Sequence, residues 1–172
     1  MRRSTTRTFV RRGRVRTDVK WATPSLISDQ NVLASATLSA TLLQDADWDS
    51  LITFDRATLL RIRGWIAVSQ GTSSPATTGL MMAIWKMPQA VTVPQPTLNA
   101  SYDLTDTLWT GGATWAASAA TSSSGYYMPI DVKVKRKLDP EDMIVWAARC
   151  TTATAFCRVS GFLRCLWQYT KS

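Results

Sequence analysis

The stretch Thr58-Leu-Leu-Arg-Ile-Arg-Gly-Trp-Ile-Ala-Val-Ser-Gln70 alternates apolar side chains with charged or polar ones along most of its length. A period of two is typical of a β-strand that has one face in the core and one face outside it. Gly64, inside this pattern, indicates a bulge or a close approach of a neighbouring backbone. The inward set is expected to be Leu60, Ile62, Ile66 and Val68, and the outward set Arg61, Arg63, Trp65 and Ser69.

Segments on both sides of this strand repeat the pattern between turn-rich loops. Pro140, in Leu138-Asp-Pro-Glu-Asp142, presets a tight turn between two of them. Residues 47–60 are the best helix candidate, but their β-branched and aromatic residues weaken it. The further expected strands are residues 32–43, 80–87, 97–104, 108–117, 128–138, 143–150 and 155–169. About eight strands without a long helix predict an all-β fold, an eight-stranded antiparallel jelly-roll sandwich.

A basic segment, residues 1–20, precedes the strands and contains eight cations and a single carboxylate, for a net charge of +7. The whole chain carries +8, so the body, residues 21–172, is nearly neutral. Because the segment has few apolar residues, we expect a disordered arm. It would bind phosphates in a salt-dependent way that ignores base sequence and is alike for DNA and RNA. The expected nucleic-acid-binding residues are Arg2, Arg3, Arg7, Arg11, Arg12, Arg14, Arg16 and Lys20.

Three other interpretations of the basic segment differ in their support. A nuclear-import signal, recognised by a host import receptor, fits the composition and is compatible with nucleic-acid binding. A mitochondrial presequence would form an amphipathic helix, which Gly13 and several β-branched residues disfavour. A secretory signal needs an apolar segment after its charges, and none follows here. Because no run approaches the roughly 18 apolar residues that cross a bilayer, membrane insertion is not expected.

Residues that carry catalysis or bind metals are scarce. The chain has no His, which removes the commonest general base and metal ligand. Its cysteines, Cys150, Cys157 and Cys165, form no CxxC pair and are expected to be reduced and mostly buried. Asp45, Asp47 and Asp49 resemble the start of a calcium loop, but that loop needs glycine at 50 and glutamate at 56, where this chain has serine and arginine. We therefore expect no catalytic residues, no metal site and no cofactor, and predict that the protein is not an enzyme.

Basic and aromatic residues outside the arm suggest further contacts. Arg61 and Arg63 share one strand face, where they would extend a basic surface or pair with aspartates of an adjoining subunit. A second basic set is open to two interpretations, a solvated strand face or a nucleic-acid contact; it comprises Lys133, Lys135, Arg136 and Lys137. Tryptophan is favoured at interfaces. Four of the eight lie in loops or weak strands and are the better candidates for contacting neighbours or genome, although core packing fits them equally: Trp21, Trp48, Trp109 and Trp115.

Two segments carry a resemblance to a known family: Arg56-Ala-Thr-Leu-Leu-Arg-Ile-Arg-Gly-Trp-Ile-Ala-Val68 and Val132-Lys-Val-Lys-Arg-Lys-Leu-Asp-Pro-Glu-Asp-Met-Ile-Val145. Together with the Arg-rich start, they resemble the single jelly-roll capsid proteins of small circular single-stranded DNA viruses that encode a replication initiator. The chain is shorter than circovirus coats and its arm is briefer. The resemblance implies a coat subunit that self-assembles into a T=1 icosahedral shell of about sixty copies. It also implies an arm inside the shell on the single-stranded DNA genome, and locations in the virion and, during assembly, in the host nucleus.

Two rival functions follow from the same residues. A non-assembling nucleic-acid-binding β-sandwich would use the arm and aromatic stacking, and would stay a monomer or small oligomer. A cytokine-like or lectin-like sandwich that binds acidic glycans would need secretion, which the N-terminal segment does not support. Particle formation separates the coat subunit from both rivals.

Overall fold

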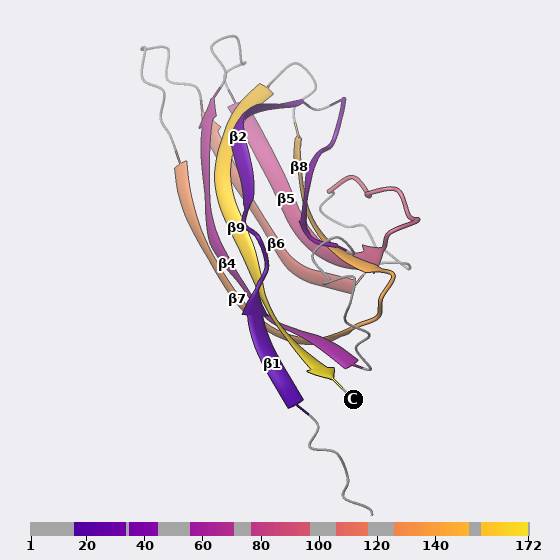
Figure 1. Cartoon of the computed structure of the whole chain (residues 1–172). Helices are drawn as coiled ribbons and strands as arrows, with labels where there is room; N and C mark the ends of the chain where they lie inside the picture. Colours follow the sequence, from indigo (N-terminus) through magenta and orange to yellow (C-terminus); the bar gives the residue numbers. More distant parts are fainter. Residues whose placement is uncertain are drawn as a thin grey trace, which may run out of the picture.

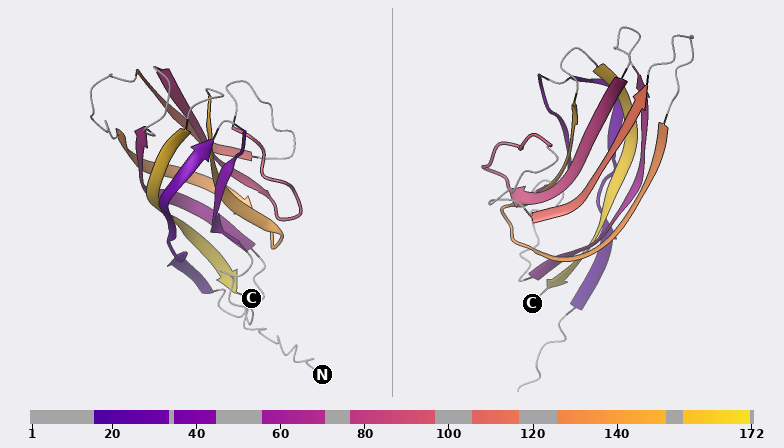
Figure 2. Two further views of the ribbon diagram at one scale, coloured as in Figure 1. Left: turned by 90° about the horizontal axis from the view of Figure 1, so that it is seen from above. Right: turned by 180° about the vertical axis from the view of Figure 1, so that it is seen from behind.

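The computed structural model describes residues 16–33, 35–44, 56–70, 77–96, 106–116, 126–151 and 156–171. These residues form nine β-strands in two facing sheets (Figures 1 and 2). The strands are β1 (Arg16–Trp21), β2 (Ser25–Leu33), β3 (Leu38–Leu43), β4 (Arg56–Gln70), β5 (Thr77–Pro88), β6 (Asp106–Ala116), β7 (Tyr126–Leu138), β8 (Asp142–Cys150) and β9 (Phe156–Lys171).

The strand order within the sheets defines the topology. One sheet runs β2-β9-β4-β7, with β1 also paired to β9, and the other runs β3-β8-β5-β6. Strands β2 to β9 therefore form four nested antiparallel pairs: β2 with β9, β3 with β8, β4 with β7 and β5 with β6. Eight strands wound in this way into two sheets make a jelly roll. The all-β, antiparallel jelly-roll prediction is confirmed.

The core lies between the two sheets, and β4 shows how the sequence pattern enters it. Ile62, Ile66 and Val68 are buried, as the alternation predicts. The assignment of Leu60 to the inward set is wrong: Leu59 is the buried residue and Leu60 is half-buried. The pairing of β4 with both neighbours shifts between Leu59 and Arg61, so a bulge changes which residues face inward.

Gly64 is required by the close approach of β9. A β-carbon at this position would meet the carbonyl oxygen of Phe162 on the neighbouring strand. The prediction of a close backbone approach at Gly64 is confirmed.

The expected strand over residues 32–43 is two strands that lie in different sheets. β2 ends at Leu33 and pairs with β9, whereas β3 begins at Leu38 and pairs with β8. The chain crosses from one layer to the other in between, which the continuous alternation of small and apolar residues does not reveal. Elsewhere β4, β5, β6, β7, β8 and β9 correspond to expected strands; residues 97–104 lie outside the described residues.

The chain that leads into the jelly roll is already part of a sheet. Residues 16–20, assigned from sequence to the arm, lie in β1, which pairs with β9 from Arg16↔Lys171 to Trp21↔Leu166. The ladder continues through a hydrogen bond from the Ala22 amide to the Cys165 carbonyl, 2.8 Å, before β2 takes over along the same edge. β1 thus begins at the end of the sandwich where β9 finishes (Figure 1).

The outer faces of the two sheets differ. On the β3-β8-β5-β6 sheet, Ala83, Trp85 and Ala147 form a second buried cluster against Val93, from the segment that follows β5. β8 is therefore buried along both faces. The outer face of the other sheet carries exposed charged and aromatic side chains and is the better candidate for a functional surface.

Candidate nucleic-acid interface

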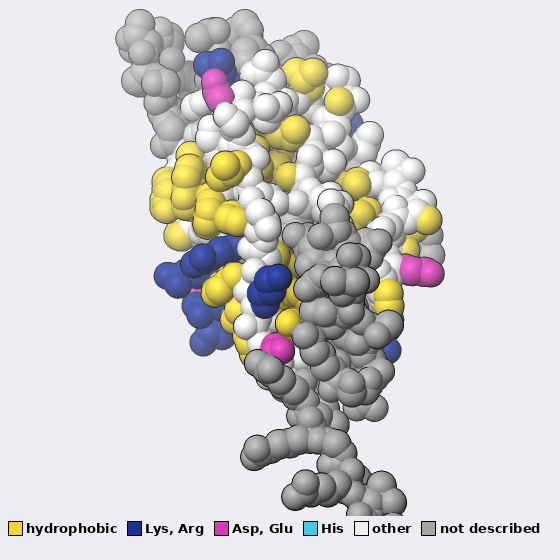
Figure 3. Space-filling model, viewed as in Figure 1, with side chains coloured by type: hydrophobic (Ala, Val, Ile, Leu, Met, Phe, Trp, Pro, Cys, Tyr) yellow, Lys and Arg dark blue, Asp and Glu magenta, His cyan; other side chains and the backbone are white. Residues whose placement is uncertain are grey.

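Cations gather on the outer face of the sheet that contains β4, β7 and β9. Arg63 lies opposite Arg164 of β9 on one side and opposite Asp131 of β7 on the other. Arg61 lies opposite Lys133. The outward-facing charged residues here carry five positive charges and one negative charge and are named the cation rows. They are Arg61, Arg63, Asp131, Lys133, Lys135 and Arg164. Figure 3 shows Lys and Arg side chains clustered at the β4–β7 side of the molecule.

Asp131 is the carboxylate inside this cluster. Its side chain accepts a hydrogen bond from Nε of Arg61, 2.5 Å, and a second from Nη2 of the same guanidinium. These hydrogen bonds, together with the charges of Arg61, Arg63 and Lys133, hold the pKa of Asp131 below its usual value. One carboxylate among three cations leaves the surface positive, and Arg63, Lys133 and Lys135 form no ion pair with the described residues.

Arg164 is held between aromatic rings at the β1 side of the same face. Its guanidinium lies 4.2 Å from the ring centroid of Trp21 and 5.9 Å from that of Phe162. Both are cation–π distances, and the flanking rings restrict where the guanidinium points. The edge strand β1 therefore helps to position a cation of the interface.

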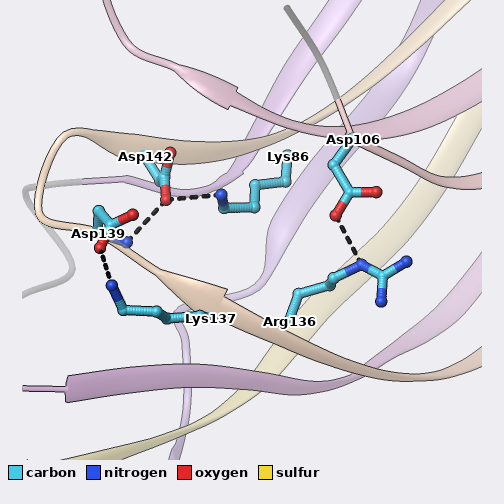
Figure 4. Close-up of polar contacts among 6 residues, drawn as sticks. All are labelled: Lys86, Asp106, Arg136, Lys137, Asp139 and Asp142. Atoms are coloured by element: carbon cyan, nitrogen blue, oxygen red, sulfur yellow. Dashed lines mark hydrogen bonds and ion pairs between the residues drawn. The ribbon is translucent and has the colours of Figure 1, made fainter.

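The second predicted basic set divides between two places. Lys133 and Lys135 face outward on β7 beside β4, as a nucleic-acid contact requires. Arg136 instead pairs with Asp106 of β6 across the open side of the sandwich, 2.6 Å, and Lys137 pairs with Asp139 in the following turn, 2.8 Å (Figure 4). Arg136 and Lys137 thus form exposed ion pairs within the chain, outside the cation rows.

Most of the arm lies outside the described residues, and only its end can be placed. Arg2, Arg3, Arg7, Arg11, Arg12 and Arg14 are among the undescribed residues. Arg16 is the first residue of β1, and Lys20 is exposed on the same strand. The arm is therefore attached to the sheet that carries the cation rows. Its role in binding nucleic acid stays a prediction.

Aromatic side chains complete the surface, and most of them are not marked by any pattern in the sequence. Trp65 stacks on Tyr127, with ring centroids 5.8 Å apart and an interplanar angle of 26°. Phe162 lies opposite Trp65 on β9. The outward position of Trp65 was predicted from the alternation of β4, but its partners come from β7 and β9, so no local pattern in the sequence marks the group.

The remaining candidate sites receive no support from the described residues. Asp45, Asp47, Asp49 and Trp48 lie outside them, and the side chain of Trp115 is not described. Trp21 and Trp109 are half-buried. The described part of the chain contains no cluster of three or more metal-ligating side chains. It also contains no helix long and apolar enough to cross a membrane.

Comparisons with known proteins give structural similarities of low identity. No family model and no curated protein matches the chain. A chain in the structure of Turnip yellow mosaic virus at 100 K is 12% identical with a TM-score of 0.36, covering 92% of this chain and 94% of that chain. A chain of Desmodium yellow mottle tymovirus is 9% identical with a TM-score of 0.32, and the match covers 92% of this chain and 89% of that chain. A chain of infectious bursal disease virus, Gx strain, is 12% identical with a TM-score of 0.38, and the match covers 92% of this chain and 36% of that chain. At identities and TM-scores this low, the similarities do not establish the fold or the function of this chain. The jelly-roll assignment rests on the chain's own strand pairing.

Proposed function

We propose that the chain is a viral coat subunit, a structural protein and not an enzyme. It self-assembles into a small icosahedral shell and packages single-stranded DNA through its Arg-rich arm. The observation that supports the proposal is β1, which contains residues 16–20 of the basic segment and pairs with β9 in the sheet whose outer face bears the cation rows. One nucleic-acid strand could then contact both.

The charge distribution supports packaging by many copies acting together. If about sixty copies formed a shell, arms of +7 each would supply on the order of 420 positive charges to the enclosed strand. Each arm would bind weakly and without base specificity. Because the shell would join all the arms, they would bind one nucleic-acid strand together and with a higher overall affinity. The nearly neutral body would limit repulsion between subunits.

Electron microscopy of two proteins tests this function. The full chain is compared with a variant that lacks residues 1–15, which retains β1 and its pairing with β9. We expect closed, uniform particles from both, with the absorbance ratio at 260 and 280 nm reporting nucleic acid in the full-chain particles alone. Monomers from both proteins at high concentration, with and without single-stranded DNA, would contradict the shell.

A second candidate function, the non-assembling nucleic-acid-binding sandwich, is favoured by the cation rows themselves, which lie on one subunit. It predicts single-stranded DNA binding by a monomer or small oligomer. In the same experiment it would give binding by the full chain and no particles from either protein. That result would replace the coat function with this one.

A further inference from the structure

A row of apolar side chains crosses four strands of the outer sheet face. Leu26 of β2 is opposite Phe162 of β9, Phe162 is opposite Trp65 of β4, and Trp65 is opposite Pro129 of β7. Directly paired residues of antiparallel strands point to the same face of a sheet. The four side chains therefore form one line across the sheet, named here the apolar row.

The apolar row is accessible on the surface. Leu26 is 75% exposed, and Tyr127, which stacks on Trp65, is 60% exposed. Figure 3 shows hydrophobic side chains grouped directly above the cluster of Lys and Arg at the β4–β7 side. Trp65 and Phe162 between Leu26 and Tyr127 are half-buried. Apolar side chains that adjoin one another at a surface, rather than lying singly, mark candidate binding sites.

The cation rows lie immediately beside the apolar row. Arg63 precedes Trp65 by two residues on β4, and Arg164, which is opposite Arg63, follows Phe162 by two residues on β9. Two residues along a strand correspond to about 7 Å. The surface therefore has a line of positive charge beside a line of aromatic side chains. This arrangement matches a polymer that has a charged backbone on one side and flat rings on the other.

A shallow hollow opens at the β2 end of the apolar row. Its volume is about 510 Å³, and its lining includes Leu26, Trp65 and Phe162 on the apolar side and Asp29 and Ser160 on the polar side. The β2 pairing shifts between Ile27 and Gln30, and Asp29 has a positive φ of 40°. The Asp29 amide donates to Ser160 Oγ, 3.2 Å, and its carboxylate pairs with Arg158, 3.1 Å. The bulge thus holds polar groups at the rim of an aromatic hollow.

We propose that this face is a stacking surface for single-stranded nucleic acid. The phosphates lie along the cation rows, and unstacked bases lie on Trp65, Tyr127 and Phe162, with one base in the hollow beside Leu26. The proposal rests on the proposed nucleic-acid-binding function and adds a second contact to it, on the folded body. Base–aromatic stacking tolerates any sequence because every base has a π-face.

The neighbouring charges favour a nucleic acid over a second copy of the chain as the occupant. A copy that covered the apolar row would also have to cover Arg63, Arg164 and Lys133, and each of these cations would then need a carboxylate of the copy placed opposite it. Burial of unpaired cations in a protein contact is costly. Phosphates would neutralise them directly.

Two oligonucleotides separate base stacking from charge. Oligothymidylate and an abasic oligodeoxynucleotide of the same length carry the same phosphates, and only the first carries bases. Binding of the full chain to each is followed by fluorescence anisotropy, below the concentration at which light scattering detects assembly. We expect the wild-type protein to bind oligothymidylate more tightly than the abasic strand.

A pair of adjacent tyrosines provides the variant and its control. Tyr127 faces the apolar row, whereas Tyr126 is opposite Val68, a core residue, and so points to the other face of the sheet. Tyr127→Ala should lower the affinity for oligothymidylate about fivefold or more and leave the abasic affinity unchanged. Tyr126→Ala should change neither affinity. If Tyr127→Ala lowers the urea midpoint of unfolding, Tyr127→Leu keeps the apolar contact and serves in its place.

A lysine variant tests the assignment of phosphates to the cation rows. Lys133→Ala should weaken binding of both oligonucleotides by the same factor and reduce the salt dependence of each. A loss confined to oligothymidylate would contradict the assignment of phosphates to the cation rows.

Each failure has its own signature. Equal wild-type affinity for the two oligonucleotides, or equal effects of Tyr127→Ala and Tyr126→Ala, would overturn the stacking surface while leaving nucleic-acid binding intact. A Tyr127→Ala variant that forms fewer particles but keeps the base preference would show that the apolar row is a contact between copies. Failure of the wild-type chain to bind either strand would overturn the proposed function itself.

Discussion

At the scale of single residues, Asp131 lowers the positive charge of the cation rows. It binds Arg61 and lies within the electrostatic reach of Arg63 and Lys133. Replacing it with asparagine removes one negative charge and releases Arg61. We expect Asp131→Asn to tighten binding of single-stranded DNA severalfold and to steepen the salt dependence by about 0.7 in log–log slope, one extra phosphate contact. Anisotropy titrations at several salt concentrations measure both.

Glu141→Gln is the matched control, because it removes the same charge from an exposed turn away from the cation rows. An equal gain from both variants would show that net charge alone matters. The wild-type protein should also approach the Asp131→Asn variant as the pH falls through the lowered pKa of Asp131. The stabilising contribution of the Arg61 pair has the matching sign: it is present at neutral pH and is lost as the pH falls through that pKa.

The cysteines make a second prediction at this scale. The Sγ atoms of Cys150 and Cys157 are 3.1 Å apart, and all three cysteines are buried. Hydrogen bonding to Cys150 and burial raise the pKa of Cys157 far above its ordinary value. We expect the native protein to react slowly with Ellman's reagent near pH 8, because burial keeps the reagent from all three thiols. Unfolded protein should react at all three cysteines.

The raised pKa also sets the direction of a pH effect on stability. The contribution of the Cys157 thiol is complete below about 8.5, the unfolded value, and declines as the pH rises above it. Rapid reaction of one thiol in the native protein would contradict the burial. A count of one thiol in denaturant would show that Cys150 and Cys157 had been oxidised to a disulfide.

At the scale of elements, the β7–β8 turn is held by one carboxylate. Asp142 is nearly buried, pairs with Lys86 of β5 at 3.0 Å, and accepts a hydrogen bond from the Asp139 amide at 2.7 Å (Figure 4). Its own amide donates to the Asp139 carbonyl, 2.9 Å. Asp142→Ala leaves Lys86 and the Asp139 amide without these partners. We expect a loss of about 1–3 kcal/mol in the free energy of unfolding, measured by urea denaturation.

Glu141→Ala tests whether that loss is specific to the turn's hydrogen bonds. Its side chain is exposed, and its backbone carbonyl accepts from the Gln89 amide whatever the side chain. We expect a change within about 0.5 kcal/mol. Equal losses from the two substitutions would contradict the role of Asp142.

The edge strand β1 gives a prediction about truncation. It covers β9 from Leu166 to Lys171, and Trp21 covers Arg164. Removing residues 1–21 should expose this edge and so lower the urea midpoint and promote aggregation. Removing residues 1–15 should leave the midpoint unchanged. Equal midpoints for the two truncations would show that β1 contributes nothing to the fold.

At the scale of the whole molecule, salt dependence should divide nucleic-acid binding between arm and body. The first fifteen residues contain six arginines. If each contacts one phosphate, removing them should reduce the log–log slope of affinity against salt by about 4, since each contact with a single strand contributes roughly 0.7. The cation rows should supply the remaining slope. A slope near zero after truncation would show that the body does not contribute.

Much of the fold could be predicted because the strands alternate regularly. β7 keeps Ile130 inward and Asp131 and Lys133 outward, and β9 keeps Val159 and Leu163 in the core, which follows the alternation in their sequences. The errors occurred where pairing overrides local pattern. The β4 bulge moved the buried position from Leu60 to Leu59, and a crossing between layers divided residues 32–43. The bulge and the crossing both depend on which strands pair, and the paired strands are far apart in the sequence.

The sequence by itself determined the all-β class, the basic arm and the positions of most strands, because hydrophobic periodicity and charge are local properties of the chain. Only the tertiary structure decided which side chains meet on the outer face. Trp65, Tyr127 and Phe162 are far apart in sequence and come together because β4 pairs with both β7 and β9. The same pairing brings Arg61 and Arg63 beside Lys133 and Arg164, whereas Arg136 is directed across the sandwich to Asp106. A surface built across strands depends on register, and register is a property of the assembled sheet.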